Sequence, residues 1–319
     1  FVIVDECHTL VEWKWRESLS KLGRVLRTAL GDGDDAPSIL ALSGTETSIG
    51  MRAVAASLCM REPKYVRGSL DRPELRYVVV DMSDASGSDA RAIIKRAVEA
   101  IVTFATPEVN KGRAVVFVAT TKDADAVAQL LQESGFVAMR YHANKKTMTD
   151  EERTATMTAF KTTRGAFLIA TLAASLGLDI PNVRLVVHLA VRCNARTWIQ
   201  EMGRAGRDQK PAVCVQLFHP RLLAVLGEFE DFGPSSCAGG NLRAVLRTIA
   251  LQRCRALILG LLGDALDHDC TGCDVCAPAD YAKVPAPSKL TDLTHAAQTL
   301  LRVTIDAECS GKAITARLR

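Results

Sequence analysis

The sequence predicts an α/β protein with buried parallel sheets, followed by a smaller helical part that carries a cysteine cluster. Three observations lead to this fold class. Eight short apolar segments alternate with helical patterns over the first two thirds of the chain. The alternation ends near residue 220, and Cys270, Cys273 and Cys276 follow close together. Strands that alternate with helices need crossover connections, which are typical of parallel sheets.

The eight apolar segments are rich in Val, Ile and Leu, and most are apolar on both faces. Strands of a parallel sheet have this pattern because helices cover both faces of the sheet. The expected strands are Phe1–Val4, Ser38–Leu42, Arg76–Val80, Ala114–Val118, Val137–Tyr141, Ala166–Ala170, Arg184–Leu189 and Val213–Phe218.

Helices are expected between these strands, where apolar residues recur three and four positions apart. The stretches 19–30 and 127–131 each mark one apolar helical face. Thr149 stands three residues before Glu152, which is the spacing of a capping box at a helix start. Beyond the alternating part, residues 221–232 and 241–262 have further helical patterns.

The composition excludes several classes of protein. Hydrophobic residues make up 48% and charged residues 24%, which are ordinary globular values and argue against a disordered or fibrous chain. No apolar run reaches the roughly 18 residues that a membrane-spanning helix needs, so we expect no membrane partner. The formal net charge of +4 neither requires nor excludes a nucleic-acid partner.

A pair of acidic residues follows the first expected strand directly. Asp5 and Glu6 stand at its carboxyl end, the edge of a parallel sheet where ligands bind. Two adjacent carboxylates there suit phosphoryl transfer, because the first can hold Mg²⁺ and the second can polarise the attacking water. The alternative for the pair alone is an acidic turn without a function.

The sharpest signal is the run Gln-Glu-Met-Gly-Arg-Ala-Gly-Arg-Asp at 200–208. Its arginines, Arg204 and Arg207, each follow a glycine. Arginine pairs its planar fork with phosphate oxygens and stays charged, and glycine lets the backbone approach closely. The run therefore predicts contacts to a bound triphosphate, against the alternative of a solvated basic loop at a helix end.

Both runs resemble motifs of a known helicase family. Val-Asp-Glu-Cys-His at 4–8 resembles motif II, the DEAH or DECH box, of superfamily 2 helicases. The run 200–208 resembles motif VI of the RecQ family of DNA helicases, in which the second arginine is an arginine finger. The resemblance implies this role for Arg207, and supporting contacts around the nucleotide and the interdomain cleft for Arg204 and Gln200.

The same resemblance implies a RecA-like motor in which ATP binds between two parallel-sheet lobes. It implies that Asp5 positions Mg²⁺, that Glu6 activates water, and that His8 belongs with the catalytic residues of the box. Ala-Leu-Ser-Gly-Thr at 41–45 occupies the place of motif III, which couples the nucleotide state to DNA. Ser43 and Thr45 are therefore expected near the nucleotide.

Two later stretches also match in the expected order. Tyr-His-Ala at 141–143 and the residues up to Phe160 resemble the RecQ segment after motif IV, and residues 170–184 are similar to motif V. The resemblance implies that Thr171 contacts a nucleic-acid phosphate and that Asp179 lies near the nucleotide. Taken alone, Thr171 has the alternative reading of a helix cap.

An aromatic and basic stretch fills the place of the RecQ loop that senses single-stranded DNA. It reads Glu-Trp-Lys-Trp-Arg at 12–16 and is about two residues shorter than the usual family form. Aromatic rings stack on bases and arginine pairs with the backbone. Trp13, Trp15 and Arg16 are thus expected to bind DNA, with packing of both tryptophans at a helix start as the alternative.

The cysteine pattern predicts a metal site. Ten Cys are too few for a disulfide scaffold of this length, and a tight cluster among scattered thiols indicates a reducing compartment. Cys254, Cys270, Cys273 and Cys276 form C-x15-C-x2-C-x2-C, which suits tetrahedral Zn²⁺. The alternative is reduced cysteines without a metal. The arrangement closely resembles the RecQ zinc-binding subdomain.

The resemblance divides the chain into four parts. We expect a partial first RecA-like lobe at 1–70, a second lobe at 71–220, a zinc-binding subdomain at 221–286 and the start of a winged-helix domain at 287–319. The phosphate-cradling loop G-x-x-x-x-G-K-[ST] is absent from these residues. We therefore expect that this polypeptide alone does not hydrolyse ATP, and that Phe1 is an interior residue of a longer protein.

The function implied is that of an ATP-dependent 3′-to-5′ DNA helicase acting on single-stranded and duplex DNA, with ATP, Mg²⁺ and Zn²⁺ as cofactors. Family resemblance alone implies DNA repair and recombination, and a nuclear location. Three alternatives stay open: an inactive zinc-containing DNA-binding fragment, an RNA helicase of the same superfamily, and a non-motor protein that reuses the fold.

Overall fold

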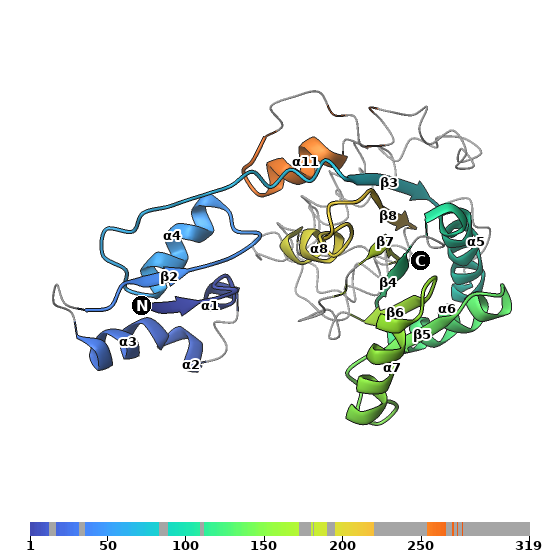
Figure 1. Ribbon diagram of the computed structural model, residues 1–319, viewed down its shortest axis with the longest axis horizontal. Coiled ribbons are helices and arrows are strands. Elements are labelled where there is room, and N and C mark those ends of the chain that lie inside the picture. The colour runs from blue at the N-terminus through green and yellow to red at the C-terminus, as the bar shows by residue number, and fades with distance from the viewer. Residues whose placement is uncertain are drawn as a thin grey trace. The chain divides into compact units, whose positions relative to one another are not determined.

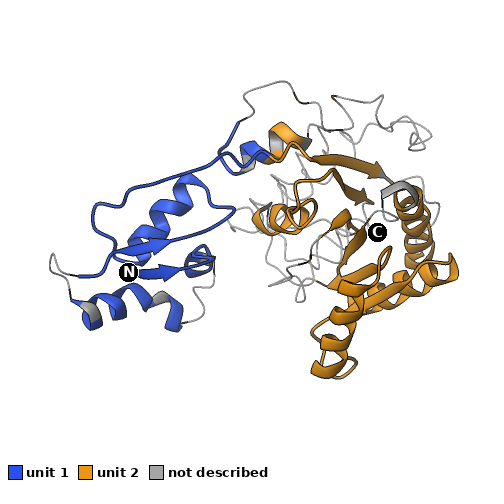
Figure 2. Cartoon of the chain, in the orientation of Figure 1, with its two compact units in different colours: residues 1–71, 259–265 blue, residues 72–258, 266–319 orange. Residues whose placement is uncertain are grey.

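The computed structural model describes residues 1–12, 17–31, 36–82, 89–108, 112–171, 180, 182–189, 195–219, 254–265, 270, 273 and 276. Two compact units make up the chain (Figure 2). The first contains residues 1–71 together with 259–265, and the second begins at Arg72.

The first unit is built on two parallel strands. Val2 pairs with Ile39 and Val4 with Ala41, so both strands end at the same edge. A small core of Cys7, Leu10, Val54 and Leu58 lies under the helices. The elements are β1 (Val2–Val4), α1 (Thr9–Glu12), α2 (Glu17–Ser20), α3 (Leu22–Leu30), β2 (Ile39–Ala41) and α4 (Ser48–Ser57).

The second unit is built on a six-stranded, entirely parallel sheet in the order β3-β8-β7-β4-β6-β5 (Figure 1). Every residue of β6 and β7 is buried, which explains why these segments are mostly apolar on both faces. The strands are β3 (Leu75–Asp81), β4 (Arg113–Val118), β5 (Ala138–Tyr141), β6 (Phe167–Thr171), β7 (Val183–His188) and β8 (Ala212–Phe218).

Helices connect these strands and cover the sheet. Their apolar faces form one core with the sheet, which includes Ile101, Val127 and Leu131 among the fully buried residues. The helices are α5 (Ala90–Glu108), α6 (Thr121–Glu133), α7 (Asp150–Thr162) and α8 (Ala195–Met202), and a further helix, α11, spans Cys254–Leu261.

The α/β fold class is confirmed, and each of the eight expected strands is present within one residue at either end. The capping box at Thr149 is also present, since Thr149 accepts from the amide of Glu152 and the Glu152 carboxylate accepts from the amide of Thr149. The helical face expected over 19–30 is divided between α2 and α3. Within the described residues, no helix is long and apolar enough to span a membrane.

Much of the region beyond the second sheet lies outside the described residues. This applies to the helix expected at 221–232, most of the expected zinc-binding subdomain and all of the expected start of a winged helix at 287–319. Of the helix expected over 241–262, the structure describes the last part as α11.

Candidate nucleotide and nucleic-acid site

The acidic pair lies in the turn that follows β1, at the carboxyl edge of the first unit's strands. Both Asp5 and Glu6 are exposed. The amide of Glu6 donates to Asp5 Oδ1 at 2.8 Å, and Glu6 has a φ of 47°, which is uncommon for a residue other than glycine. A non-glycine residue held at a positive φ costs about 1–3 kcal/mol, and this conformation persists where neighbouring contacts fix the backbone. Here the amide of Cys7 donates to the carbonyl of Leu42 at 2.9 Å and fixes the turn against the other strand.

His8 joins the acidic turn to the segment after β2. Its ring is buried, with Nδ1 3.3 Å from Glu6 Oε2 and 3.2 Å from Ser43 Oγ. Ser43 Oγ in turn accepts from the amide of Thr45 at 3.4 Å. The structure thus brings together Glu6, His8, Ser43 and Thr45, residues from two stretches that lie far apart in the sequence. A change at the Glu6 carboxylate can pass to the Ser43 segment through one imidazole ring.

The arginine run begins in α8 and continues into the turn 203–208. Arg204 is buried and Arg207 is exposed, so the two arginines face different surroundings. Gly206 has a φ of 60°, and a Cβ there would lie 3.2 Å from the Leu75 side chain and 3.0 Å from the carbonyl of Lys210. Glycine is therefore required at this position, because both the backbone conformation and the close approach disfavour a side chain.

Three sets of contacts hold the backbone of this turn. The Arg72 guanidinium donates to the carbonyls of Ala205 and Gly206 at 3.1 and 3.0 Å. The amide of Gly206 donates to the carbonyl of Val183 at 3.1 Å, which ties the turn to the start of β7. Since the backbone is fixed on both sides of Ala205, the turn presents the exposed Arg207 in a defined position.

The third set is the ion pair of Arg184 with Asp208. Burial opposes the charged form of Asp208, but its hydrogen bond with Arg184 and the attraction of that cation hold the pKa of Asp208 below its usual value. Asp208 is next to Arg207 in the chain, so the pair fixes the end of the turn on which Arg207 stands.

A buried pair fixes α8 to the sheet. His188 Nε2, at the end of β7, is 2.9 Å from Glu201 Oε2 in α8, and each side chain is only 1% exposed. The ring of Phe117 stacks on His188 with centroids 5.2 Å apart. A pair so far from water ties the helix that leads into the arginine turn to the centre of the sheet.

The three clustered cysteines come together. Their Sγ atoms all lie within 4.8 Å of one another, and those of Cys270 and Cys273 are 3.5 Å apart. Cys273 forms a parallel bridge with Tyr77 of β3, which places the cluster beside the sheet. The hydrogen bond with Cys273, burial and the nearby thiols raise the pKa of Cys276 to about 12.

Comparison with known proteins agrees with these features. Residues 94–209 match the family model described as the helicase conserved C-terminal domain. The chain is 27% identical over 283 residues to the ATP-dependent DNA helicase RecQ of Pasteurella multocida, covering 86% of this chain and 42% of that protein. It is 24% identical over 318 residues to the protein of the same name in Haemophilus influenzae, covering 98% of this chain and 47% of that protein.

Over most of its length the chain is similar to RecQ helicases of superfamily 2, and its residues 94–209 match the helicase C-terminal domain. It spans less than half of the length of the two curated RecQ proteins. The fold is also similar to that of S. cerevisiae Dbp5 bound to RNA and ADP BeF3, with a TM-score of 0.51 and 17% identity, over 77% of this chain and 56% of that one. The parallel sheet of the second unit is thus a RecA-like lobe.

Not every expected site residue of this chain is described. Thr171 is the last residue of β6 and is buried. His142, in the segment after motif IV, is buried too, and burial lowers the pKa of its imidazole. The expected DNA contacts Trp13, Trp15 and Arg16, the expected nucleotide contact Asp179 and the side chain of Cys254 lie outside the described residues.

Sequence reasoning missed the residues that hold the RecQ motifs in place. His188 is a polar residue inside an otherwise apolar strand, which is a usable signal for a buried polar pair. Its partner Glu201 stands inside the arginine run without an assigned role. The Arg184–Asp208 pair gave no comparable signal, because charged residues at strand starts and in turns are common.

Proposed function

We propose that the protein, in its full natural length, is an ATP-dependent DNA helicase that moves 3′ to 5′ along single-stranded DNA and unwinds duplex DNA. The observation that carries the proposal is the arginine turn, which buries Arg204 and presents Arg207 on a backbone held from three directions. The names of the RecQ relatives support the choice of DNA and of ATP.

The chemistry of this reaction assigns a role to each residue. Asp5 would hold magnesium, which would supply positive charge to the phosphates of ATP. Glu6 polarises the attacking water, and Arg207 stabilises the charge that develops on the phosphoryl group. Arg204, Gln200, Asp179 and Thr45 are supporting contacts around the nucleotide. Arginine suits this task because its fork pairs with two phosphate oxygens at once.

Coupling between DNA and hydrolysis runs through the His8 contacts. Ser43 stands on the segment that links nucleotide state to DNA, and His8 Nδ1 is within 3.3 Å of both Glu6 and Ser43. Thr171 binds a phosphate of the single strand, while Trp13, Trp15 and Arg16 stack on bases and pair with the backbone.

The test is ATP hydrolysis by the full-length protein with and without single-stranded DNA. DNA is expected to stimulate hydrolysis, and Glu6→Gln is expected to abolish it because the amide cannot accept a proton from water. Glu99→Gln on the exposed face of α5 is the matched control and should hydrolyse ATP normally. Equal stimulation by RNA would favour an RNA helicase, no hydrolysis by the unaltered protein would favour a non-motor protein, and normal hydrolysis by Glu6→Gln would contradict the role of Glu6.

A second test concerns residues 1–319 alone. They contain no phosphate-cradling loop, so this polypeptide is expected to bind DNA without hydrolysing ATP. Hydrolysis by residues 1–319 would contradict this expectation and show that another segment of these residues holds the phosphates of ATP.

We further propose that Cys254, Cys270, Cys273 and Cys276 bind one Zn²⁺ ion. Four thiolates at about 2.3 Å from zinc form a tetrahedron with sulfur atoms about 3.8 Å apart. The Sγ spacing of the three clustered cysteines fits three corners of that tetrahedron. Bound zinc would replace the protons of these thiols, because metal binding favours thiolates.

The zinc proposal predicts the metal content of the purified chain. Elemental analysis should give about one zinc per chain, and Cys273→Ser should lose it together with thermal stability. Cys59→Ser is the matched control, since Cys59 is an exposed free thiol in the first unit. Zinc retained in full by Cys273→Ser, or no zinc in the unaltered chain, would contradict the proposal.

The biological setting is a separate proposal. Similarity to RecQ helicases supports roles in DNA repair and recombination. The nuclear location remains a prediction from the resemblance alone, since the two curated relatives compared here are bacterial.

A further inference from the structure

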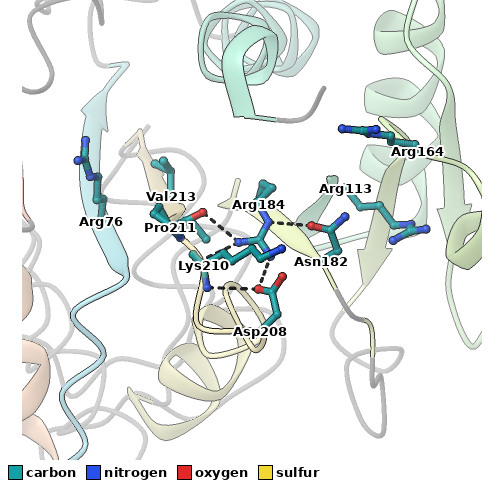
Figure 3. Close-up of a pocket in the computed structure, with 10 residues that line it drawn as sticks. Arg76, Arg113, Arg164, Asn182, Arg184, Asp208, Lys210, Pro211 and Val213 are labelled. Carbon is teal, nitrogen blue, oxygen red and sulfur yellow. Dashed lines mark hydrogen bonds and ion pairs between the residues drawn. The ribbon is translucent and has the colours of Figure 1, made fainter. Parts of the chain in front are cut away.

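A pocket of about 800 Å³ lies at the amino-terminal edge of the six-stranded sheet (Figure 3). Of the residues that the structure describes, five cationic side chains and one carboxylate, that of Asp208, line it. We call the five cations the cationic row. They are Arg76, Arg113, Arg164, Arg184 and Lys210.

The parallel topology orders these cations in a line. Arg76, Arg113 and Arg184 are the first or second residues of β3, β4 and β7, while Arg164 and Lys210 shortly precede β6 and β8. In the sheet these five strands are consecutive neighbours, in the order β3-β8-β7-β4-β6. Because neighbouring strands lie about 4.8 Å apart, five of them span about 19 Å. The row is therefore extended, and Figure 3 shows Arg76 and Arg164 on opposite sides of Arg184.

Arg184 organises the floor of the pocket. It is only 3% exposed, and it donates to Asn182 Oδ1 at 3.0 Å, to the carbonyls of Lys210 and Pro211 at 2.8 and 3.0 Å, and to Asp208. An arginine has five N–H donors, so these bonds occupy most of them. Arg184 thus holds the segment that carries Lys210 against β7, and it pairs with the carboxylate of Asp208.

The outer members of the row are better placed to bind a ligand. Arg76, Arg164 and Lys210 are exposed, and Arg113 donates to the carbonyl of Phe160 at 2.7 Å. This edge is opposite to the carboxyl end of β6, where Thr171 stands. The pocket is therefore separate from the DNA contact proposed at Thr171, and Arg207 does not line it.

We propose that this pocket binds a linear chain of phosphate groups. Arginine and lysine are the side chains that recognise phosphate, and a line of them matches a ligand whose charges are also in line. A volume of about 800 Å³ is in the range of small-ligand sites. Two kinds of ligand carry such a chain of phosphate groups: an inorganic polyphosphate and a short single-stranded oligonucleotide with its phosphodiester backbone.

Occupancy of the pocket has a consequence for the arginine turn. Asp208 and Lys210 both line the pocket, and Asp208 directly follows Arg207. A ligand on Lys210 holds this segment, and with it the position of Arg207. This consequence rests on the proposed ATP hydrolysis, whereas binding itself does not.

The test is calorimetric titration of residues 1–319 with inorganic tripolyphosphate. Lys210→Glu and Arg76→Glu are each expected to weaken binding about tenfold or more, the loss of one charge-assisted contact. Lys146→Glu, an exposed lysine outside the pocket, is the matched control with the same change in net charge. It should bind as the unaltered chain does. Circular dichroism checks that each variant is folded.

The outcomes separate the two kinds of ligand. Tripolyphosphate binding that is lost in Lys210→Glu, with no such loss for a five-nucleotide thymidylate, assigns the site to polyphosphate. The same loss for the thymidylate, measured by fluorescence anisotropy and reversed by tripolyphosphate, assigns it to a phosphodiester. Equal weakening in Lys210→Glu and Lys146→Glu would overturn the proposal, as would orthophosphate binding as tightly as tripolyphosphate. None of these measurements depends on ATP hydrolysis, so they stand even if the proposed function fails.

Discussion

Arg207→Ala in the full-length protein is expected to lower DNA-stimulated ATP hydrolysis by about 10³–10⁵, the range for loss of an arginine finger. The physical reason is that Arg207 carries its charge on the exposed side of a turn whose backbone is fixed by Arg72 and by the Arg184–Asp208 pair, whereas Arg204 is buried. The measurement is steady-state hydrolysis at saturating DNA.

Two further variants make this result specific. Arg207→Lys keeps the charge but loses the planar fork, and we expect it to recover only a small part of the rate. Arg91→Ala, which removes an exposed arginine at the start of α5, should leave the rate unchanged. A full rate in Arg207→Ala would show that another group stabilises the transition state.

Glu201→Ala is expected to lower the free energy of unfolding of the chain by about 3–5 kcal/mol, the cost of removing one partner from a buried pair. Glu201 Oε2 is 2.9 Å from His188 Nε2, and each side chain is only 1% exposed. After the substitution, the imidazole stays buried beside Phe117 without its partner. Urea unfolding followed by circular dichroism measures the change.

Double substitution distinguishes the pair from simple loss of volume. His188→Leu combined with Glu201→Leu removes both polar groups, so we expect it to cost less than Glu201→Ala alone. Glu99→Ala, at an exposed position of α5, should change stability by no more than about 0.5 kcal/mol. The single substitutions His188→Leu and Glu201→Leu complete the cycle, and losses that simply add up in the double variant would contradict a direct interaction.

The strands were predictable because their physical cause is local. A strand buried on both faces is mostly apolar, and Ala114–Val118 of β4, Phe167–Ala170 of β6 and Leu185–Val187 of β7 carry that pattern in consecutive residues. The helix start at Thr149 was predictable for the same reason, since its cap lies three residues from its partner. The motif residues were recognised by their resemblance to a family rather than by geometry.

The supporting contacts were not predictable, because they join residues that only the fold brings together. Arg184 meets Asp208 across 24 positions of sequence, and His8 meets Ser43 across 35. The cationic row is the clearest case. Its members are scattered from residue 76 to residue 210, and only a parallel sheet places all of their strand starts at one edge.

Strand displacement tests the central claim most directly. The full-length protein, with ATP and Mg²⁺, is given a DNA duplex with a 3′ single-stranded tail, the same duplex with a 5′ tail, and an RNA duplex with a 3′ tail. We predict unwinding of the 3′-tailed DNA, little unwinding of the other two, and none with Glu6→Gln. Equal unwinding of RNA and DNA, or unwinding that persists in Glu6→Gln, would contradict a RecQ-type DNA helicase driven by this site.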